Sequence, residues 1–176
     1  MRTEAVDRVK LVFTLLDANE NGYIESDDFE IMAQRVLRAA TGSGNAAKDA
    51  MLAAFQRYWT ALATGDTDGD GRVGFDEYRA CVLSPERFDD TIDDFAESLA
   101  VLGDPNGDGL IDRSLFVALM LAIGFERENI DALFDAFGPN DSDQITVPTW
   151  AAGIKDYYAP DKADIPGDQL VGKSTD

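Results

Sequence analysis

Apolar residues recur along the chain at the spacing of one helical face, in segments that polar loops separate. Val6, Val9, Phe13 and Leu16 form the first of these stripes, which predicts a helix over residues 3–16. Similar stripes predict helices that begin near residues 26, 46, 75 and 85, and three more over residues 115–123, 130–137 and 150–157. We interpret each stripe as core packing, and the predicted fold class is therefore all-α.

Local signals place some of the helix boundaries. Ser84, which a proline follows, has the residue type of an N-cap, and Gly124 is typical of a helix end. Residues 159–176 contain two prolines and little periodicity, so we interpret them as a tail. Apolar residues at Tyr158, Ile165 and Leu170 allow this tail to fold back onto the body of the protein.

The loop over residues 66–77 carries oxygen-bearing side chains at a regular spacing. Asp66, Asp68 and Asp70 occupy positions 1, 3 and 5 of a twelve-residue frame, and Glu77 occupies position 12. Gly71 at position 6 permits the sharp turn that such a frame needs. This spacing is typical of a loop that wraps around one calcium ion, because calcium takes about six to eight oxygen ligands. We expect Arg72 at position 7 to contribute its backbone carbonyl.

Two further loops, over residues 17–28 and 104–115, repeat this frame with differences at position 12. The predicted ligands of the first are Asp17, Asn19, Asn21, the carbonyl of Tyr23, and Asp28. Those of the third are Asp104, Asn106, Asp108 and the carbonyl of Leu110. Asp28 is one methylene shorter than glutamate, which makes magnesium a competitor at the first loop. Leu115 offers no ligand at position 12 of the third loop, so whether this loop binds metal stays open.

A fourth copy, over residues 138–149, is recognisable through its apolar positions. Ile24, Val73 and Ile111 occupy position 8 of the first three loops, and Ile145 continues the series. The fourth loop has Gly138 at position 1 and no acidic residue at position 12, so we expect no metal there. We expect Ile24 to pair with Val73 and Ile111 with Ile145 in short two-stranded contacts, which gives the fourth loop a supporting role.

These repeated loops, each between two helices, resemble the EF-hand superfamily over residues 4–158. Four hands with a long first interval and a degenerate last loop are most similar to the sarcoplasmic calcium-binding proteins and calerythrins. The resemblance implies two pairs of EF-hands, over residues 1–83 and 84–158, packed into one compact globule and followed by the tail at 159–176. It implies Ca²⁺ as the bound ion.

The composition limits the possible partners and location. The 176 residues carry a net charge of −19, and 45% of them are apolar. Such a charge opposes binding to nucleic acid and to anionic membranes, while the apolar share suffices for a core. The single cysteine, Cys81, precludes a disulfide within the chain, and we interpret it as a buried inert thiol. The N-terminus lacks a signal-peptide pattern, so we expect a cytoplasmic monomer.

Three functions are compatible with these features: a calcium buffer or signal modulator, a sensor that exposes an apolar groove to an unknown target protein, and a cavity protein similar to coelenterazine-binding photoproteins. Only four methionines are present, whereas sensor grooves are commonly rich in methionine, so we favour the buffer. The chain has no histidine, which argues against the photoprotein interpretation, whose family relies on histidines around its ligand. The same absence rules out histidine-based catalysis, and we expect no enzyme activity.

Overall fold

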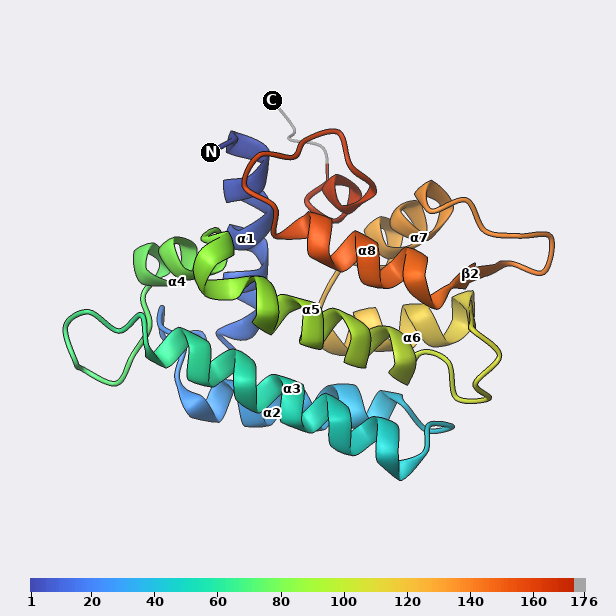
Figure 1. Ribbon diagram of the computed structural model, residues 1–176, viewed down its shortest axis with the longest axis horizontal. Coiled ribbons are helices and arrows are strands. Elements are labelled where there is room, and N and C mark those ends of the chain that lie inside the picture. Colours follow the sequence, from blue (N-terminus) through green and yellow to red (C-terminus); the bar gives the residue numbers. More distant parts are fainter. Residues whose placement is uncertain (173–176) are drawn as a thin grey trace.

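The computed structural model describes residues 1–172, and its helices follow the predicted order (Figure 1). The first half contains α1 (Thr3–Leu16), α2 (Ser26–Ala39), α3 (Asn45–Ala63) and α4 (Phe75–Val82). The second half contains α5 (Pro85–Leu102), β1 (Leu110–Asp112), α6 (Arg113–Ile123), α7 (Arg127–Ala136), β2 (Gln144–Thr146), α8 (Val147–Tyr157) and the 3₁₀ helix η1 (Pro166–Leu170).

Two predicted helix boundaries have a clear local cause. Gly124 follows α6 with a φ of 116°, a left-handed conformation that glycine adopts without strain. Ser84 precedes α5 with an extended backbone, and Pro85 is the first helical residue. The side chain of Ser84 makes no capping hydrogen bond, so the proline and the backbone conformation define this helix start.

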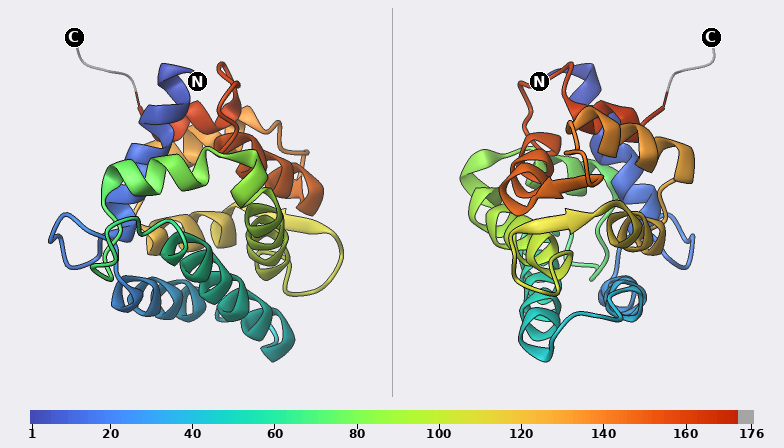
Figure 2. Two further views of the ribbon diagram at one scale, coloured as in Figure 1. Left: turned by 60° about the vertical axis from the view of Figure 1, so that its left-hand side comes forward. Right: turned by 90° about the vertical axis from the view of Figure 1, so that its right-hand side faces the viewer.

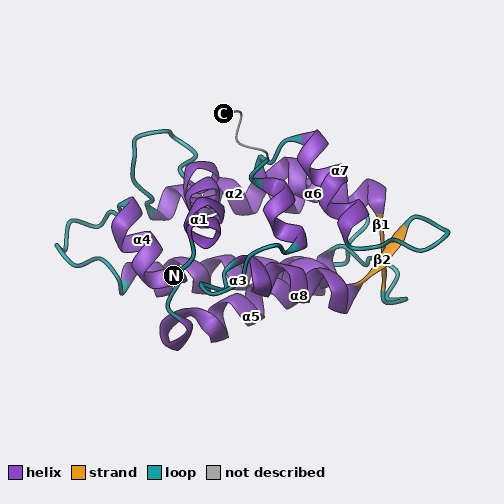
Figure 3. Cartoon of the chain, turned by 90° about the horizontal axis from the view of Figure 1, so that it is seen from above, coloured by secondary structure: helices purple, strands orange, loops and turns teal. Residues whose placement is uncertain are grey.

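The four loops pair as the position-8 residues predict. Ile24 and Val73 form an antiparallel bridge in which each backbone amide lies 2.9 Å from the partner's carbonyl oxygen. Ile111 pairs with Ile145 at the centre of the antiparallel β1–β2 sheet. The two loop pairs lie at opposite ends of the molecule, with β1 and β2 at one end and the loops after α1 and α3 at the other (Figure 3).

Both halves of the chain contribute to one hydrophobic core. Helix α3 packs along α5, and α2 packs against α6, so that helices from the first half lie against helices from the second (Figure 2). The aromatic rings interlock across this junction: the ring of Tyr58 lies 5.4 Å from that of Phe95 and 5.0 Å from that of Phe88. The prediction of four helix–loop–helix units packed into one compact globule is therefore confirmed.

The tail folds back onto the body of the protein as far as residue 172. Tyr158 and Leu170 are buried, and η1 packs against α1, α7 and α8. The side chain of Arg8 on α1 is fully buried beneath the tail. Residues 173–176 of the predicted tail lie outside the described residues. The tail is therefore part of the folded structure over its described length.

Two further expectations concern the state of the Cys81 thiol and whether any helix could cross a membrane. Cys81 is buried, and burial raises the pKa of its thiol, which lowers the fraction of the reactive thiolate. None of the helices in the described part of the chain combines the length and the apolar character needed to cross a membrane.

Candidate metal centres

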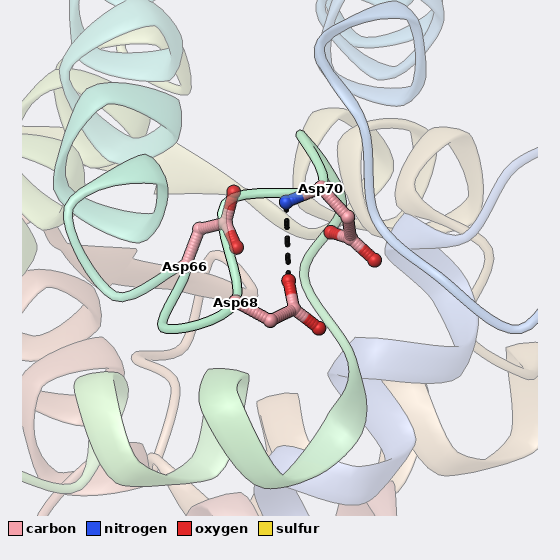
Figure 4. A group of neighbouring side chains, drawn as sticks. All are labelled: Asp66, Asp68 and Asp70. Carbon is pink, nitrogen blue, oxygen red and sulfur yellow. Dashed lines mark hydrogen bonds between the residues drawn. The ribbon is translucent and has the colours of Figure 1, made fainter.

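The second loop, between α3 and α4, brings three carboxylates together. Asp66, Asp68 and Asp70 each offer an oxygen, and these oxygens all lie within 4.8 Å of one another (Figure 4). Two oxygens on opposite sides of one calcium ion are separated by roughly 4.6–5.2 Å, twice the usual bond length. The three side chains therefore have the chemistry and the spacing to share one calcium ion.

Glu77 closes the second loop from the first turn of α4. Its Oε1 accepts hydrogen bonds from the backbone amide (3.0 Å) and hydroxyl (2.9 Å) of Thr67, and its Oε2 accepts one from the amide of Gly74 (3.0 Å). The amides of Gly74 and Thr67 hold the pKa of Glu77 below its ordinary value. The carboxylate is therefore ionised at neutral pH, and the backbone amides of positions 2 and 9 hold it in place. Thr67 therefore helps to position the Glu77 carboxylate, a role that the sequence pattern did not reveal.

In the first loop, Asp28 occupies the same place as Glu77 despite its shorter side chain. Its Oδ1 accepts a hydrogen bond from the amide of Ala18 (3.0 Å) at position 2, and its Oδ2 accepts one from the amide of Glu25 (2.9 Å) at position 9. Asp28 is fully buried, and burial raises the pKa of this carboxyl group. A divalent cation would offset this cost because it favours the ionised form.

The first three loops share two hydrogen bonds that shape the ligand cage. In each, the aspartate at position 1 accepts a hydrogen bond from the glycine amide at position 6, and the side chain at position 5 accepts one from the amide at position 7. The position-1 bonds are Gly22 to Asp17 (2.8 Å), Gly71 to Asp66 (2.9 Å) and Gly109 to Asp104 (2.8 Å). The position-5 bonds are Tyr23 to Asn21 (3.1 Å), Arg72 to Asp70 (2.8 Å) and Leu110 to Asp108 (2.9 Å).

The glycines at position 6 have a left-handed backbone in all three loops, with φ between 78° and 86°. This conformation turns the amide of position 6 toward the aspartate at position 1, and a side chain at this position would introduce strain. The sequence prediction that glycine permits the turn therefore has a direct geometric basis in each of the three loops.

The third loop matches the other two except at its end. The side chain of Asn106 accepts a hydrogen bond from the amide of Asp108 (3.3 Å), as position 3 does in the other loops. Leu115 at position 12 packs against the hydrophobic core instead of reaching toward the loop. Asp112 at position 9 accepts a hydrogen bond from the side chain of Gln144 (2.7 Å). The loop thus brings together only the ligands of its first half.

The fourth loop has a different internal structure. Gly138 at position 1 has no side chain to accept the hydrogen bond that an aspartate accepts in the other loops. Asn140 instead accepts hydrogen bonds from the amides of Ser142 (3.0 Å) and Gln144 (3.0 Å). Asp143 stands at position 6 with a φ of 59°, and its carboxylate is held by Arg113. This arrangement offers an ion no set of converging carboxylates.

Sequence reasoning missed one link between the first two loops. The guanidinium Nε of Arg72 lies 3.4 Å from a carboxylate oxygen of Glu25, and the guanidinium lies 5.5 Å from the centre of the Tyr23 ring. The antiparallel register contained the signal: if Ile24 faces Val73, the next residue on one strand faces the preceding residue on the other. Arg72 thus connects the first two loops, and its backbone is also part of the second loop.

Comparison with known proteins agrees with this geometry. The family described as an EF-hand domain pair matches residues 6–83. Parvalbumin beta of Graptemys geographica is 34% identical over 82 residues, which are 47% of this chain and 67% of that protein. The chain belongs to the EF-hand family. Parvalbumin beta of Amphiuma means is 38% identical to this EF-hand protein over 78 residues, 44% of the chain and 63% of the parvalbumin, a little under two thirds of its length.

Solved structures share the fold of this EF-hand protein over almost its whole length. The sarcoplasmic calcium-binding protein of amphioxus is 20% identical, with a TM-score of 0.69, and the similarity covers 98% of each chain. The photoprotein clytin is 18% identical, with a TM-score of 0.74, over 98% of this chain and 94% of its own. A Streptomyces coelicolor calcium-binding protein is 21% identical, with a TM-score of 0.69, and the similarity covers 86% of this chain and 95% of that protein. At these identities the similarity concerns the fold alone.

This EF-hand protein is therefore a calcium-binding protein by family, homologous to the parvalbumins. The acidic cluster of Asp66, Asp68 and Asp70 offers carboxylate oxygens, the kind of ligand that calcium takes.

Proposed function

We propose that this EF-hand protein is a calcium buffer or signal modulator that stays compact when calcium binds. Ca²⁺ is the expected ion, with Mg²⁺ competing mainly at the first loop. The proposed sites are the first and second loops, and a third, weaker one lies in residues 104–115. We further propose that it acts as a cytoplasmic monomer, that residues 1–83 and 84–158 are its two EF-hand units, and that it binds ions rather than catalysing a reaction.

The ligands of each proposed site follow from the shared loop frame. For the first site they are Asp17, Asn19, Asn21, the Tyr23 carbonyl and Asp28. For the second they are Asp66, Asp68, Asp70, the Arg72 carbonyl and Glu77. For the third they are Asp104, Asn106, Asp108 and the Leu110 carbonyl. The second site has four carboxylates, so we expect it to bind calcium most tightly.

The fused core is the observation that carries the buffer proposal. A sensor needs an EF-hand pair whose helices can separate and expose an apolar groove. Here α2 packs against α6 and α3 against α5, so the apolar faces of the first half are already covered by the second. The 3₁₀ helix η1 covers α7 in the same way. Opening either pair would require the whole core to separate, which favours a compact response to calcium.

Fluorescence of the apolar dye ANS tests this proposal. The protein is measured metal-free, then in millimolar magnesium, then after addition of calcium. We expect a high metal-free signal, because repulsion among the loop carboxylates loosens the fold, and a fall with either cation to a level that stays low. A marked rise between magnesium and calcium would mean that calcium exposes apolar surface. That result would replace the buffer with the alternative, a sensor with a target protein.

A second candidate function, the binding of a small uncharged apolar molecule, has one specific observation in its favour. The core contains a cavity of about 70 Å³ whose lining is almost entirely apolar and comes from both halves and the tail, including Val12, Phe29, Leu99, Trp150 and Tyr158. Voids larger than a water molecule are rare in protein cores. Burial raises the pKa of Tyr158 to about 12, so its hydroxyl stays neutral and the lining is uncharged at neutral pH. The fold shared with the photoprotein clytin is compatible with this candidate.

Xenon tests the cavity directly, because apolar cavities that exclude water take up xenon. We expect xenon to shift the NMR signals of the lining methyl groups of the calcium-loaded protein. Val12→Phe should remove these shifts, because the larger side chain fills the cavity. Val101→Phe makes the same change on an exposed part of α5 and should leave them intact. Ordered water in the cavity, or equal xenon shifts in both variants, would contradict an apolar binding site.

A further inference from the structure

Arg113 forms the densest group of ion pairs in the described part of the chain. It is the first residue of α6, and its side chain is 24% exposed. Its Nε and one terminal nitrogen donate to the two carboxylate oxygens of Asp143, at 2.8 and 3.0 Å. The terminal nitrogens also donate to Asp135 (2.5 Å) and Asp131 (3.3 Å). One guanidinium thus holds three carboxylates.

These three carboxylates belong to different parts of the fourth hand. Asp131 and Asp135 lie on α7, the helix that enters the fourth loop, and Asp143 lies in the loop itself at position 6. The Arg113 guanidinium carbon also lies 4.5 Å from the centre of the Phe134 ring on α7. The side chain therefore ties the entering helix to the loop, from a helix that belongs to the third hand.

The backbone of Arg113 extends the β1–β2 sheet by one step. Its amide lies 3.3 Å from the carbonyl oxygen of Asp143, directly after the pair formed by Asp112 and Gln144. Asp143 and Arg113 are consequently opposite each other in the antiparallel register, where opposite charges are stabilising. Arg113 thereby holds the fourth loop against the third through both its side chain and its backbone.

The carboxylates of the group face fixed positive charge: Arg113 pairs with all three, and Arg127 also pairs with Asp131. The hydrogen bonds that Arg113 donates to Asp143 hold the pKa of that carboxyl below its ordinary value. The hydrogen bonds that Arg113 donates to Asp143 and Asp135 also raise the pKa of the guanidinium. In the other three hands, the corresponding loops carry aspartates at position 1, where a bound cation would offset the negative charge. The fourth loop has Gly138 there, and its nearby carboxylates already face a fixed positive charge.

We propose that Arg113 is a positioning residue that gives the fourth hand a built-in cation. Its guanidinium takes the stabilising role that a bound metal has in the other hands, so that β2 and the fourth loop keep their structure without metal. The response to calcium is then confined to the first three loops, while the fourth hand provides a constant framework. This inference goes beyond the proposed buffer function and does not depend on it.

Hydrogen exchange of the metal-free protein tests the role of Arg113. In the metal-free wild type, we expect the backbone amides of β2 to stay protected. Arg113→Met, which keeps the apolar stem but removes the charge, should accelerate their exchange by about tenfold or more, the effect of one charge-assisted hydrogen bond. Arg127→Met is the matched control, because Arg127 also pairs with Asp131 (3.1 Å) but does not contact the fourth loop. It should leave β2 protection unchanged.

Two further readouts separate a charge effect from a loss of packing. Arg113→Lys should restore part of the protection, because lysine keeps the charge but not the two-pronged hydrogen bonding. Raising the magnesium concentration should slow the exchange of β2 in Arg113→Met and have no effect on β2 in the wild type. Unprotected β2 amides in the metal-free wild type, equal acceleration by Arg127→Met, or an Arg113→Met variant that does not respond to magnesium would each overturn the proposal.

Discussion

Substitution of Glu77 by glutamine is expected to abolish the tightest calcium-binding step of this protein. The change removes one of the four charged ligands proposed for the second site and leaves a side chain of the same length. We expect the affinity of that step to fall by more than about 100-fold, because substitution of groups that only support a metal ligand already costs about 10–100-fold. Isothermal titration calorimetry of wild type and variant measures the effect.

Asp76→Asn is the matched control for Glu77→Gln. It removes the same charge from the neighbouring residue, whose side chain is 89% exposed and, among residues 1–172, pairs only with Arg79, at 3.3 Å. If both variants lost affinity equally, the effect would come from general electrostatics rather than from ligation. The glutamine oxygen can still accept the hydrogen bond from the Thr67 amide, whereas the amino group cannot accept the one from the Gly74 amide, so one of the two contacts that position the side chain is kept. An unchanged tightest step in Glu77→Gln would show that the second site is not the strongest.

The loops could be predicted from the sequence because their chemistry is local. The aspartates at positions 1 and 5 and the glycine at position 6 act on backbone amides within the same loop, such as the 2.9 Å bond from Gly71 to Asp66. Asp28 shows where local reasoning was incomplete. Its carboxylate accepts hydrogen bonds from the amides at positions 2 and 9, as that of Glu77 does, although its side chain is shorter. The weaker calcium closure that this length predicts stays a prediction.

The contacts that sequence reasoning missed join residues far apart in the chain. The partners of Arg113 lie 18 to 30 residues away, and those of Arg8 lie 149 to 160 residues away. A helical stripe assigns Arg8 to no particular partner, and only the folded tail brings its acceptors together. The pairing of Arg113 with Asp143 could be inferred from the strand register, but the pairing with the two aspartates of α7 depends on helix packing. The division into two units at residue 83 and the metal ligands themselves stay predictions.

Replacement of Arg8 by methionine is expected to destabilise the protein strongly. The Arg8 side chain is fully buried and donates to the carbonyl oxygens of Tyr157 (2.8 Å), Ala159 (3.0 Å) and Lys162 (3.0 Å). It also pairs with Asp168 at 2.7 Å. Methionine fills much of the space but leaves these acceptors without a donor, an outcome that is costly in a buried site.

We expect Arg8→Met to lower the free energy of unfolding by about 3 kcal/mol, the lower end of the range for breaking a buried ion pair. The lower end applies because Asp168 is 26% exposed and keeps part of its hydration. Urea unfolding in saturating calcium, followed by circular dichroism, measures this change. Arg2→Met is the control: Arg2 is exposed, and within the described residues its side chain makes one hydrogen bond, to the carbonyl oxygen of Asp161 (3.0 Å), so its loss should have little effect.

The comparison of these two variants decides what the tail contributes. If Arg8→Met costs several times more than Arg2→Met, the segment over residues 159–172 is a structural element that fastens α1 to the second half of the chain. Combining Arg8→Met with Asp168→Asn should then cost less than the sum of the two single changes, because both remove the same ion pair. Equal small effects of Arg8→Met and Arg2→Met would mean that the buried contacts of Arg8 only balance the cost of its desolvation, and that the apolar packing of Tyr158 and Leu170 holds the tail by itself.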